Sequence, residues 1–171
     1  MRLIGSDVKE KTVTLEWDSV NDVLEYAVVF WKNEAWEEIN RTQETKGTVS
    51  LTGYGLEGIF KICAYDNEQK QIGESAEIKV LIPAKVKKLN TTAYSKTKVK
   101  LYWETAKGAN SYEIYEKQDG KKYKLVKNVK KTDTRLDVKS KENYQFKVVP
   151  VFESTFGTIS GNAAETSTSV N

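Results

Sequence analysis

The side chains that could perform catalysis are few and poorly matched in this 171-residue sequence. Histidine is absent, which excludes a Ser-His-Asp triad, a Cys-His dyad and the usual zinc sites. Cys63 is the single cysteine, so it has no disulfide partner within the chain and no histidine that could activate it. We therefore interpret Cys63 as a small apolar residue of a strand.

The acidic residues also lack a catalytic or metal-binding pattern. Glu37 and Glu38 point to opposite faces if they lie on a strand, and the aspartate spacings 18–22 and 133–137 lack the glycine turn of a calcium loop. A Ser-Lys dyad stays open, but it would need a buried lysine with a lowered pKa, and no motif marks one. No phosphate-binding glycine motif is present. We predict no catalytic residue, no cofactor and no metal, and hence no enzyme.

An internal repeat with an offset of 86 residues organises the chain. The segment 13–17 resembles 99–103, and the segment 60–62 resembles 146–148 at the same offset. One offset that holds along both halves predicts two copies of one domain. We place these domains at residues 1–82 and 83–171, with a very short junction at Pro83, a residue that cannot donate to a sheet ladder.

Each copy has the pattern of β-strands. Val99, Leu101 and Trp103 alternate with polar residues, as do the matching residues of the first copy, which places these side chains on one buried sheet face. Turn signals such as Lys32-Asn33 and Asp66-Asn67 separate the runs. Short strands at this spacing predict an all-β chain of two tandem β-sandwich domains.

The second copy resembles a fibronectin type III (immunoglobulin-like) domain. The resemblance rests on Val99-Lys100-Leu101-Tyr102-Trp103 as the second strand and Tyr144-Gln145-Phe146-Lys147-Val148 as the sixth, with the family's core tryptophan and tyrosine. The first copy departs from the family pattern in two places. Gly58 stands where the second copy has Tyr144, and the stretch from Trp36 to Val49 lacks clear turn residues between strands. The abundance of lysine is similar to that of fibronectin type III domains in surface or secreted proteins of Gram-positive bacteria. The resemblance implies a non-catalytic domain pair at the cell surface or outside the cell.

The ends of the sequence are interpreted as those of a piece of a longer chain. The second copy has the leader Pro83-Ala84-Lys85-Val86 before its first strand, whereas the first copy has only Met1-Arg2. We therefore expect flanking domains of a parent chain as partners, and any secretion signal outside this sequence. No apolar run approaches the ~20 residues that a transmembrane helix needs, so no membrane insertion is expected.

One candidate binding surface lies on the third and sixth strands of the first copy. If Tyr26, Val28 and Phe30 face the core, their neighbours face outward. Because these two strands are adjacent in the fold, we predict an exposed apolar patch of Ala27, Val29, Trp31, Cys63 and Tyr65. Such a patch marks a binding site or an interface unless a loop or the neighbouring domain covers it, and both interpretations stay open.

A second candidate surface is the basic charge of the second copy. Residues 1–83 carry 9 Lys and Arg against 15 Asp and Glu, whereas residues 84–171 carry 18 against 9. The candidate lysines are Lys96, Lys98, Lys121, Lys122 and Lys124. They could attract an anionic cell-wall polymer or align copies head to tail in weak self-association, or they could be edge-protecting solvated lysines. Nucleic acid is not expected, because no aromatic residues interleave with the lysines.

Two functions are consistent with these observations. In the first, the pair is a spacer that presents other parts of its parent protein. In the second, it is an adhesion or binding module. Its outward face in the first domain, or its basic face in the second, would contact a glycan, an anionic polymer or a protein ligand. The fold alone does not choose between them.

Overall fold

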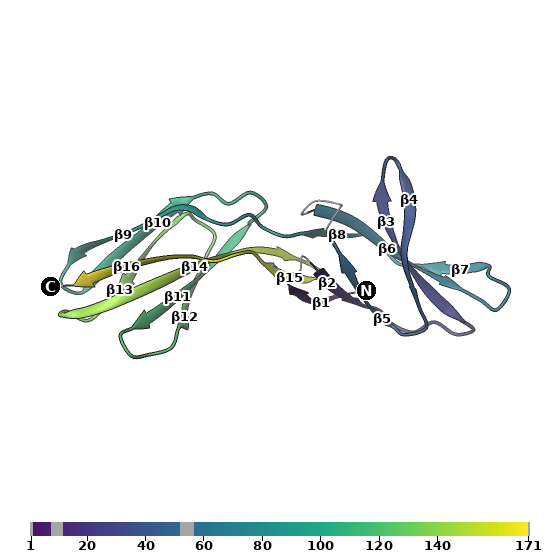
Figure 1. Cartoon of the computed structure of the whole chain (residues 1–171), viewed down its shortest axis with the longest axis horizontal. Coiled ribbons are helices and arrows are strands. Elements are labelled where there is room, and N and C mark those ends of the chain that lie inside the picture. Colours follow the sequence, from purple (N-terminus) through teal and green to yellow (C-terminus); the bar gives the residue numbers. More distant parts are fainter. Residues whose placement is uncertain (1, 8–11, 52–56, 171) are drawn as a thin grey trace. The chain divides into compact units, whose positions relative to one another are not determined.

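The computed structural model describes residues 2–7, 12–51 and 57–170, and all regular structure in these ranges is β-strand. Figure 1 shows strands throughout both units. The described part of the chain contains no helix of the length and hydrophobicity needed to cross a bilayer. The predicted all-β class is confirmed.

The chain forms two compact units. Unit 1 consists of residues 1–82 together with 154–159, and unit 2 consists of residues 83–153 and 160–171. The short segment 154–159 thus belongs to the first unit although it lies within the second sequence repeat. Repeats in the sequence and compact units in the structure therefore differ at this segment.

Unit 1 contains two antiparallel sheets. The first sheet has the order β1-β2-β5, and the second has the order β4-β3-β6-β7 with β8 also paired to β6. The strands are β1 (Arg2–Asp7), β2 (Thr12–Glu16), β3 (Glu25–Lys32), β4 (Ala35–Thr42), β5 (Lys46–Ser50), β6 (Glu57–Tyr65), β7 (Gln71–Glu74) and β8 (Ile78–Leu81). The stretch from Trp36 to Val49, which lacks clear punctuation in the sequence, forms most of β4 and β5.

Unit 2 repeats this arrangement. Its sheets have the orders β13-β10-β9 and β12-β11-β14-β15, and β16 pairs with β14. The strands are β9 (Lys87–Ser95), β10 (Lys98–Glu104), β11 (Ser111–Gln118), β12 (Lys124–Val129), β13 (Asp133–Asp137), β14 (Glu142–Ser154), β15 (Gly157–Ser160) and β16 (Ala164–Val170). Strand β15 pairs with β14, although its residues 157–159 belong to unit 1. A three-stranded sheet packed on a larger one is the strand grouping of an immunoglobulin-like sandwich.

Equivalent residues of the two copies make the same core contacts. The Trp17 and Tyr26 rings meet edge to face at 5.6 Å, and Trp103 and Tyr112 do so at 5.3 Å. Each tyrosine hydroxyl accepts a hydrogen bond of 3.0 Å from a backbone N–H six residues earlier. These four aromatic residues are buried in two separate apolar cores. The sequence repeat is therefore a repeat of packing.

The core of unit 2 contains the tyrosine that the first copy lacks. The Tyr144 hydroxyl accepts hydrogen bonds from the Lys139 backbone N–H at 2.8 Å and from the Gln118 side-chain amide at 2.9 Å. A tyrosine bonded to the backbone a few residues upstream is a recurrent corner of this sandwich. In unit 1 the rings of Phe30 and Phe60 crowd the equivalent position, Gly58.

Candidate functional site

The most distinctive surface of unit 1 is the side of the β4-β3-β6-β7 sheet that faces away from the core. Strand pairing places Ala27 opposite Cys63 and Trp31 opposite Trp36. Because successive side chains alternate across a strand, Tyr26, Val28 and Phe30 enter the core and their neighbours form this other side. We call it the outer face, which comprises Ala27, Val29, Trp31, Trp36, Glu38, Arg41, Lys61, Cys63, Tyr65, Gln71 and Glu74.

The outer face is less exposed than the sequence predicts. Trp31 is 40% exposed, but Ala27, Val29 and Cys63 retain only 0%, 7% and 6% of their accessible surface. The prediction of one exposed five-residue patch is therefore wrong for these three side chains. The physical reason is a small second core, in which they are packed against the larger rings of Trp36 and Tyr65.

Cations lie over these two covering rings. The Lys61 ammonium is 4.6 Å from the centre of the Trp36 ring and forms ion pairs with Glu74 at 3.6 Å and Glu77 at 3.9 Å. The Trp36 ring also meets the Trp31 ring edge to face at 5.2 Å. Cation–aromatic contacts of this kind are attractive, and they fix the indole of Trp36 in place.

Arg41 organises the other half of the outer face. Its guanidinium lies 4.6 Å from the centre of the Tyr65 ring and binds both carboxylate oxygens of Glu38, at 2.8 and 2.9 Å. It also donates to Glu25 at 2.6 Å and to Gln69 at 2.8 Å. The bonds to Glu38 and then Glu25 raise the pKa of Arg41. Hydrogen bonds from Gln69 and Arg41 lower the pKa of the Glu25 carboxyl. A bidentate arginine holds this arrangement rigidly.

A groove of about 320 Å³ lies on this surface, with Val29 and Cys63 among its lining residues. Trp36 and Tyr65 contribute aromatic surface to it, and its polar lining consists of Glu38, Lys61, Gln71 and Glu74. Aromatic surface beside carboxylate, amide and ammonium groups suits a ligand that has both apolar faces and hydroxyl or amide groups.

Sequence reasoning missed several of these lining residues, above all Trp36. A usable signal was present, since the Lys32-Asn33 turn marks a hairpin that brings Trp36 opposite Trp31. Alternation along the returning strand then places Glu38 on the same side as Trp36. The contribution of Gln71 and Glu74 had no comparable signal.

The thiol of Cys63 shows no sign of activation. Burial, and after it the neighbouring Glu74 carboxylate, raises the pKa of Cys63, which disfavours the reactive thiolate. Burial likewise raises the pKa of Tyr65. In the ranges that the structure describes, no group of three or more His, Cys, Asp and Glu side chains could hold a metal ion.

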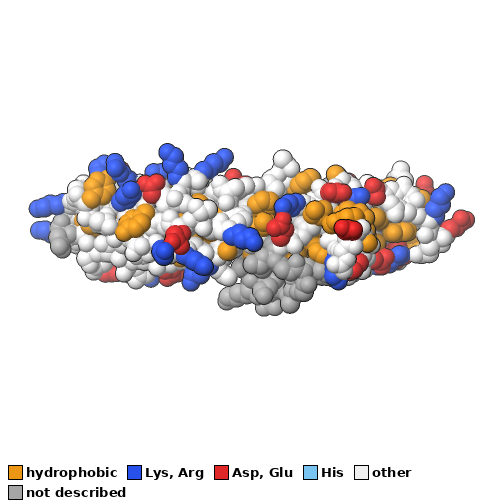
Figure 2. All heavy atoms as spheres, turned by 90° about the horizontal axis from the view of Figure 1, so that it is seen from above, with side chains coloured by type: hydrophobic (Ala, Val, Ile, Leu, Met, Phe, Trp, Pro, Cys, Tyr) orange, Lys and Arg blue, Asp and Glu red, His pale blue; other side chains and the backbone are white. Residues whose placement is uncertain are grey.

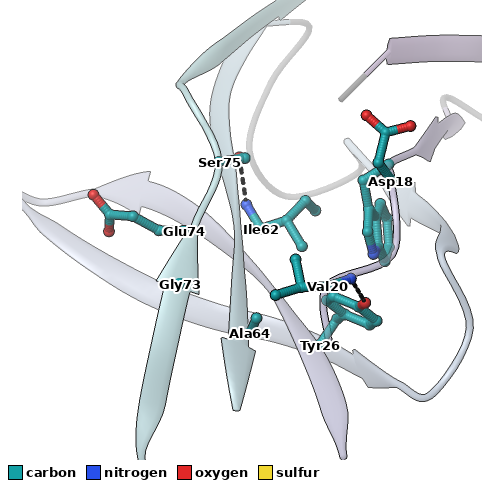
Figure 3. A pocket seen from close by; sticks show the side chains of 9 residues that line it. Asp18, Val20, Tyr26, Ile62, Ala64, Gly73, Glu74 and Ser75 are labelled. Atoms are coloured by element: carbon teal, nitrogen blue, oxygen red, sulfur yellow. Dashed lines mark hydrogen bonds between the residues drawn. The ribbon is translucent and has the colours of Figure 1, made fainter. Parts of the chain in front are cut away.

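A smaller pocket of about 200 Å³ opens beside the core of unit 1, and Trp17 and Tyr26 are among its lining residues. Figure 3 shows its apolar side chains Val20, Ile62 and Ala64, while the carboxylate of Asp18 points away from them. The buried Trp17 Nε1 has no hydrogen-bond partner in the described structure, and neither has the equivalent Trp103 Nε1. Because both copies share this feature, it belongs to the fold and does not indicate a ligand.

The candidate lysines of unit 2 divide into two groups. Lys96 and Lys98 lie at the β9–β10 turn, and Lys121 and Lys122 lie at the β11–β12 turn. All four are exposed. Lys124 begins β12, is also exposed, and forms an ion pair of 3.6 Å with the buried Glu116 carboxylate. Lys98 is paired as well, with Asp137 at 3.3 Å. The two groups are thus the paired Lys98 and Lys124, and Lys96, Lys121 and Lys122, for which the described residues show no ion pair.

No protein-family model and no curated protein sequence matches the chain at a significant level. Among solved structures, the fibronectin domains FN1–FN3 of chicken CNTN1 match 98% of this chain and 65% of theirs, at 14% identity and a TM-score of 0.52. A two-domain fibronectin type III segment from chicken tenascin matches 98% of this chain and 97% of its own, at 16% identity and a TM-score of 0.48. The match to CNTN1 shows that the fold is that of tandem fibronectin type III domains.

Proposed function

We propose that this chain is a non-enzymatic spacer that presents flanking parts of a larger surface or secreted protein. The observation that carries this proposal is the tight connection between the two cores. Ile82 is buried in the core of unit 1 and Val86 in the core of unit 2. Only three residues separate them, which span at most about 14 Å.

The connecting residues are themselves held by the structure. Pro83 is buried, and the Ala84 N–H donates a hydrogen bond of 2.9 Å to the Lys107 carbonyl oxygen. We infer that a connection this short limits bending, in contrast to a glycine- and serine-rich linker. Restricted bending is the property that a spacer needs.

The test compares the natural chain with a variant in which about ten Gly and Ser residues are inserted between Ala84 and Lys85. The variant also carries Phe156→Ser and Ile159→Ser, because residues 154–159 of the second repeat otherwise stay in the core of unit 1. Small-angle scattering and a distance measurement between one spin label in each unit should give a narrow distribution for the natural chain and a broad one for the variant. Equally broad distributions for both chains would contradict the spacer proposal.

A second candidate function is binding of a glycan through the outer face. The observation in its favour is the groove lined by Trp36 and Tyr65 next to the exposed Trp31 ring. Sugars present apolar C–H faces to aromatic rings and hydroxyl groups to carboxylates and amides, and the groove offers both kinds of surface. Large exposed aromatic surface on a soluble domain is also typical of interaction sites.

Isothermal titration with isolated cell-wall polysaccharide tests this candidate. Trp31→Ala and Trp36→Ala should each weaken binding, on the order of tenfold or more. The matched control is Tyr102→Ala, which removes an aromatic ring of similar exposure from unit 2. Failure to bind by the natural chain, or an equal loss in the Tyr102 variant, would reject the outer face as the site.

A further inference from the structure

Turns that are far apart in the sequence meet at one end of unit 2. The Val138 N–H donates to the Thr97 carbonyl oxygen at 2.9 Å, which joins the β13–β14 turn to the β9–β10 turn. The Asn143 side chain donates to Asp119 at 2.9 Å, which joins β14 to the β11–β12 turn. We call this surface the basic end because it gathers six exposed lysines: Lys96, Lys98, Lys121, Lys122, Lys139 and Lys141.

The basic end retains positive charge after its own ion pairs are counted. Its carboxylates are Asp119, Asp137 and Glu142, and among the described ion pairs only that of Lys98 with Asp137, at 3.3 Å, joins the two sets. Figure 2 shows Lys and Arg side chains gathered toward the end of unit 2 at which Figure 1 places the C-terminus. The lysines come from three separate turns, so their clustering follows from the fold and not from the sequence order.

One end of unit 1 carries the opposite charge. There the Trp17 N–H donates to the Thr45 carbonyl oxygen at 2.9 Å and the Leu24 N–H to the Tyr65 carbonyl oxygen at 2.8 Å, which join the loops after β2, β4 and β6. We call this surface the acidic end; its carboxylates are Asp18, Asp22, Glu44, Asp66 and Glu68. Its lysines are Lys46 and Lys70, and no ion pair within the described residues neutralises the five carboxylates.

We propose that a second copy of this chain docks its basic end on the acidic end, so that copies associate head to tail. The basic end has six lysines and three carboxylates, and the acidic end has five carboxylates and two lysines. The net charges of the two ends are therefore similar in size and opposite in sign. Contacts between two like ends are repulsive, which disfavours a symmetric end-to-end dimer. A contact between unlike surfaces leaves one free end of each kind, so association continues beyond the dimer. A free polyanion would match only one of the two ends.

Sedimentation equilibrium of the full chain tests this proposal. Near 20 mM salt the weight-average mass should rise steadily above that of the monomer up to about 1 mM protein. Near 500 mM salt the association constant should fall on the order of tenfold or more, because the screening length shrinks. A chain that stays monomeric at every concentration in low salt would overturn the proposal. It would be overturned even if polyphosphate, a free polyanion, binds to the monomer.

Charge reversal separates a specific contact from general attraction. The basic-end variant is Lys96→Glu, Lys122→Glu and Lys139→Glu, and the acidic-end variant is Asp18→Lys, Glu44→Lys and Glu68→Lys. Each variant alone should be monomeric, and an equimolar mixture of the two should associate again. The control variant reverses Lys107, Lys130 and Lys131, and it should associate like the natural chain because these exposed lysines lie away from the basic end.

The mixture is the decisive measurement, since restored association cannot arise from misfolded variants. Far-ultraviolet circular dichroism establishes that each variant keeps its β-structure. If the control variant loses association as completely as the basic-end variant, net charge and not the basic end causes the association, and the proposal is overturned. If the mixture stays monomeric although both variants are folded, it is also overturned.

Discussion

Gly58 shows how one residue distinguishes the two copies. A Cβ atom at this position would lie 2.6 Å from a ring carbon of Phe30 and 2.9 Å from one of Phe60. Atoms at such distances overlap, and both rings belong to the close-packed core. The sequence showed that the tyrosine equivalent to Tyr144 is missing, whereas the two rings that crowd its place are visible only in the packing.

Gly58→Ala should therefore destabilise the protein by about 1–3 kcal/mol through overpacking. Urea unfolding followed by tryptophan fluorescence measures the loss. Gly73→Ala is the matched control, because its Cβ would meet only the Ala64 Cβ at 3.9 Å, which is an ordinary contact. Equal stability of the two variants would show that the Phe30 and Phe60 rings move aside without cost.

Tyr115 makes the stability of the fold depend on pH in the alkaline range. Its hydroxyl donates a hydrogen bond of 2.7 Å to the Glu113 carboxylate, and this bond, aided by burial, raises the pKa of Tyr115 from 10.0 to about 12. A raised pKa in the folded state stabilises the fold fully below pH 10, and this contribution is lost as the pH rises from about 10 to about 12.

Absorbance at the phenolate band, recorded up to pH 13, should include the ionisation of Tyr115 near pH 12. This step should be absent in Tyr115→Phe and should move toward pH 10 in Glu113→Gln, which cannot repel the phenolate. An unchanged titration curve in Tyr115→Phe would contradict the assignment.

At the scale of elements, the inward and outward sides of β3 and β6 were predictable from the sequence. The packing of the Trp36 and Tyr65 rings over the outer face was not. Alternation along β3 and β6 assigned Val28 and Phe30 to the core and Ala27 and Cys63 to the other side, which the packing confirms. The exposure of Cys63 could not be predicted from β3 and β6 alone, because it depends on how the rings of Trp36 and Tyr65 lie over the thiol. The hairpin signal places Trp36 on this face, but it does not give the orientation of the ring. Alternation states which way a side chain points, but it does not state what lies above it.

Alkylation of Cys63 by iodoacetamide reports on this cover. The reaction in the folded chain should be on the order of tenfold slower than in the unfolded chain, because burial raises the pKa of the thiol. Trp36→Ala should speed it by uncovering the face, and Tyr102→Ala in unit 2 should not. Equal rates for Trp36→Ala and the natural chain would show that the Trp36 ring does not shield the thiol.

At the scale of the whole molecule, the two units are not simply the two repeats. Ile159 is 1% exposed and belongs to the core cluster of unit 1, and the half-buried Phe156 packs against the same cluster. Segment 154–159 nevertheless comes from the second repeat. The 86-residue offset predicts the strands of both copies from local patterns, but no local pattern reveals that a hairpin contributes to another core.

Ile159→Ala should destabilise unit 1 by about 2–4 kcal/mol, the usual cost of removing a buried side chain of this size. Hydrogen exchange should become faster at Val13 and Leu15, which lie in the same core, with a smaller effect at Leu101 in the core of unit 2. The control is Ile72→Ala, an exposed residue on β7. A larger increase in the exchange rate at Leu101 than at Leu15 in Ile159→Ala would contradict the assignment of Ile159 to unit 1.

The place of Ile159 also has a consequence for synthesis. A domain usually folds while the ribosome is still translating the domains that follow it, at roughly 5–20 residues per second. Unit 1 lacks one of its core residues until residue 159 has left the ribosome, by which time most of the second repeat has emerged as well. The nascent first repeat therefore exposes an unfilled apolar site for several seconds, and it completes its core only when the second repeat is nearly finished.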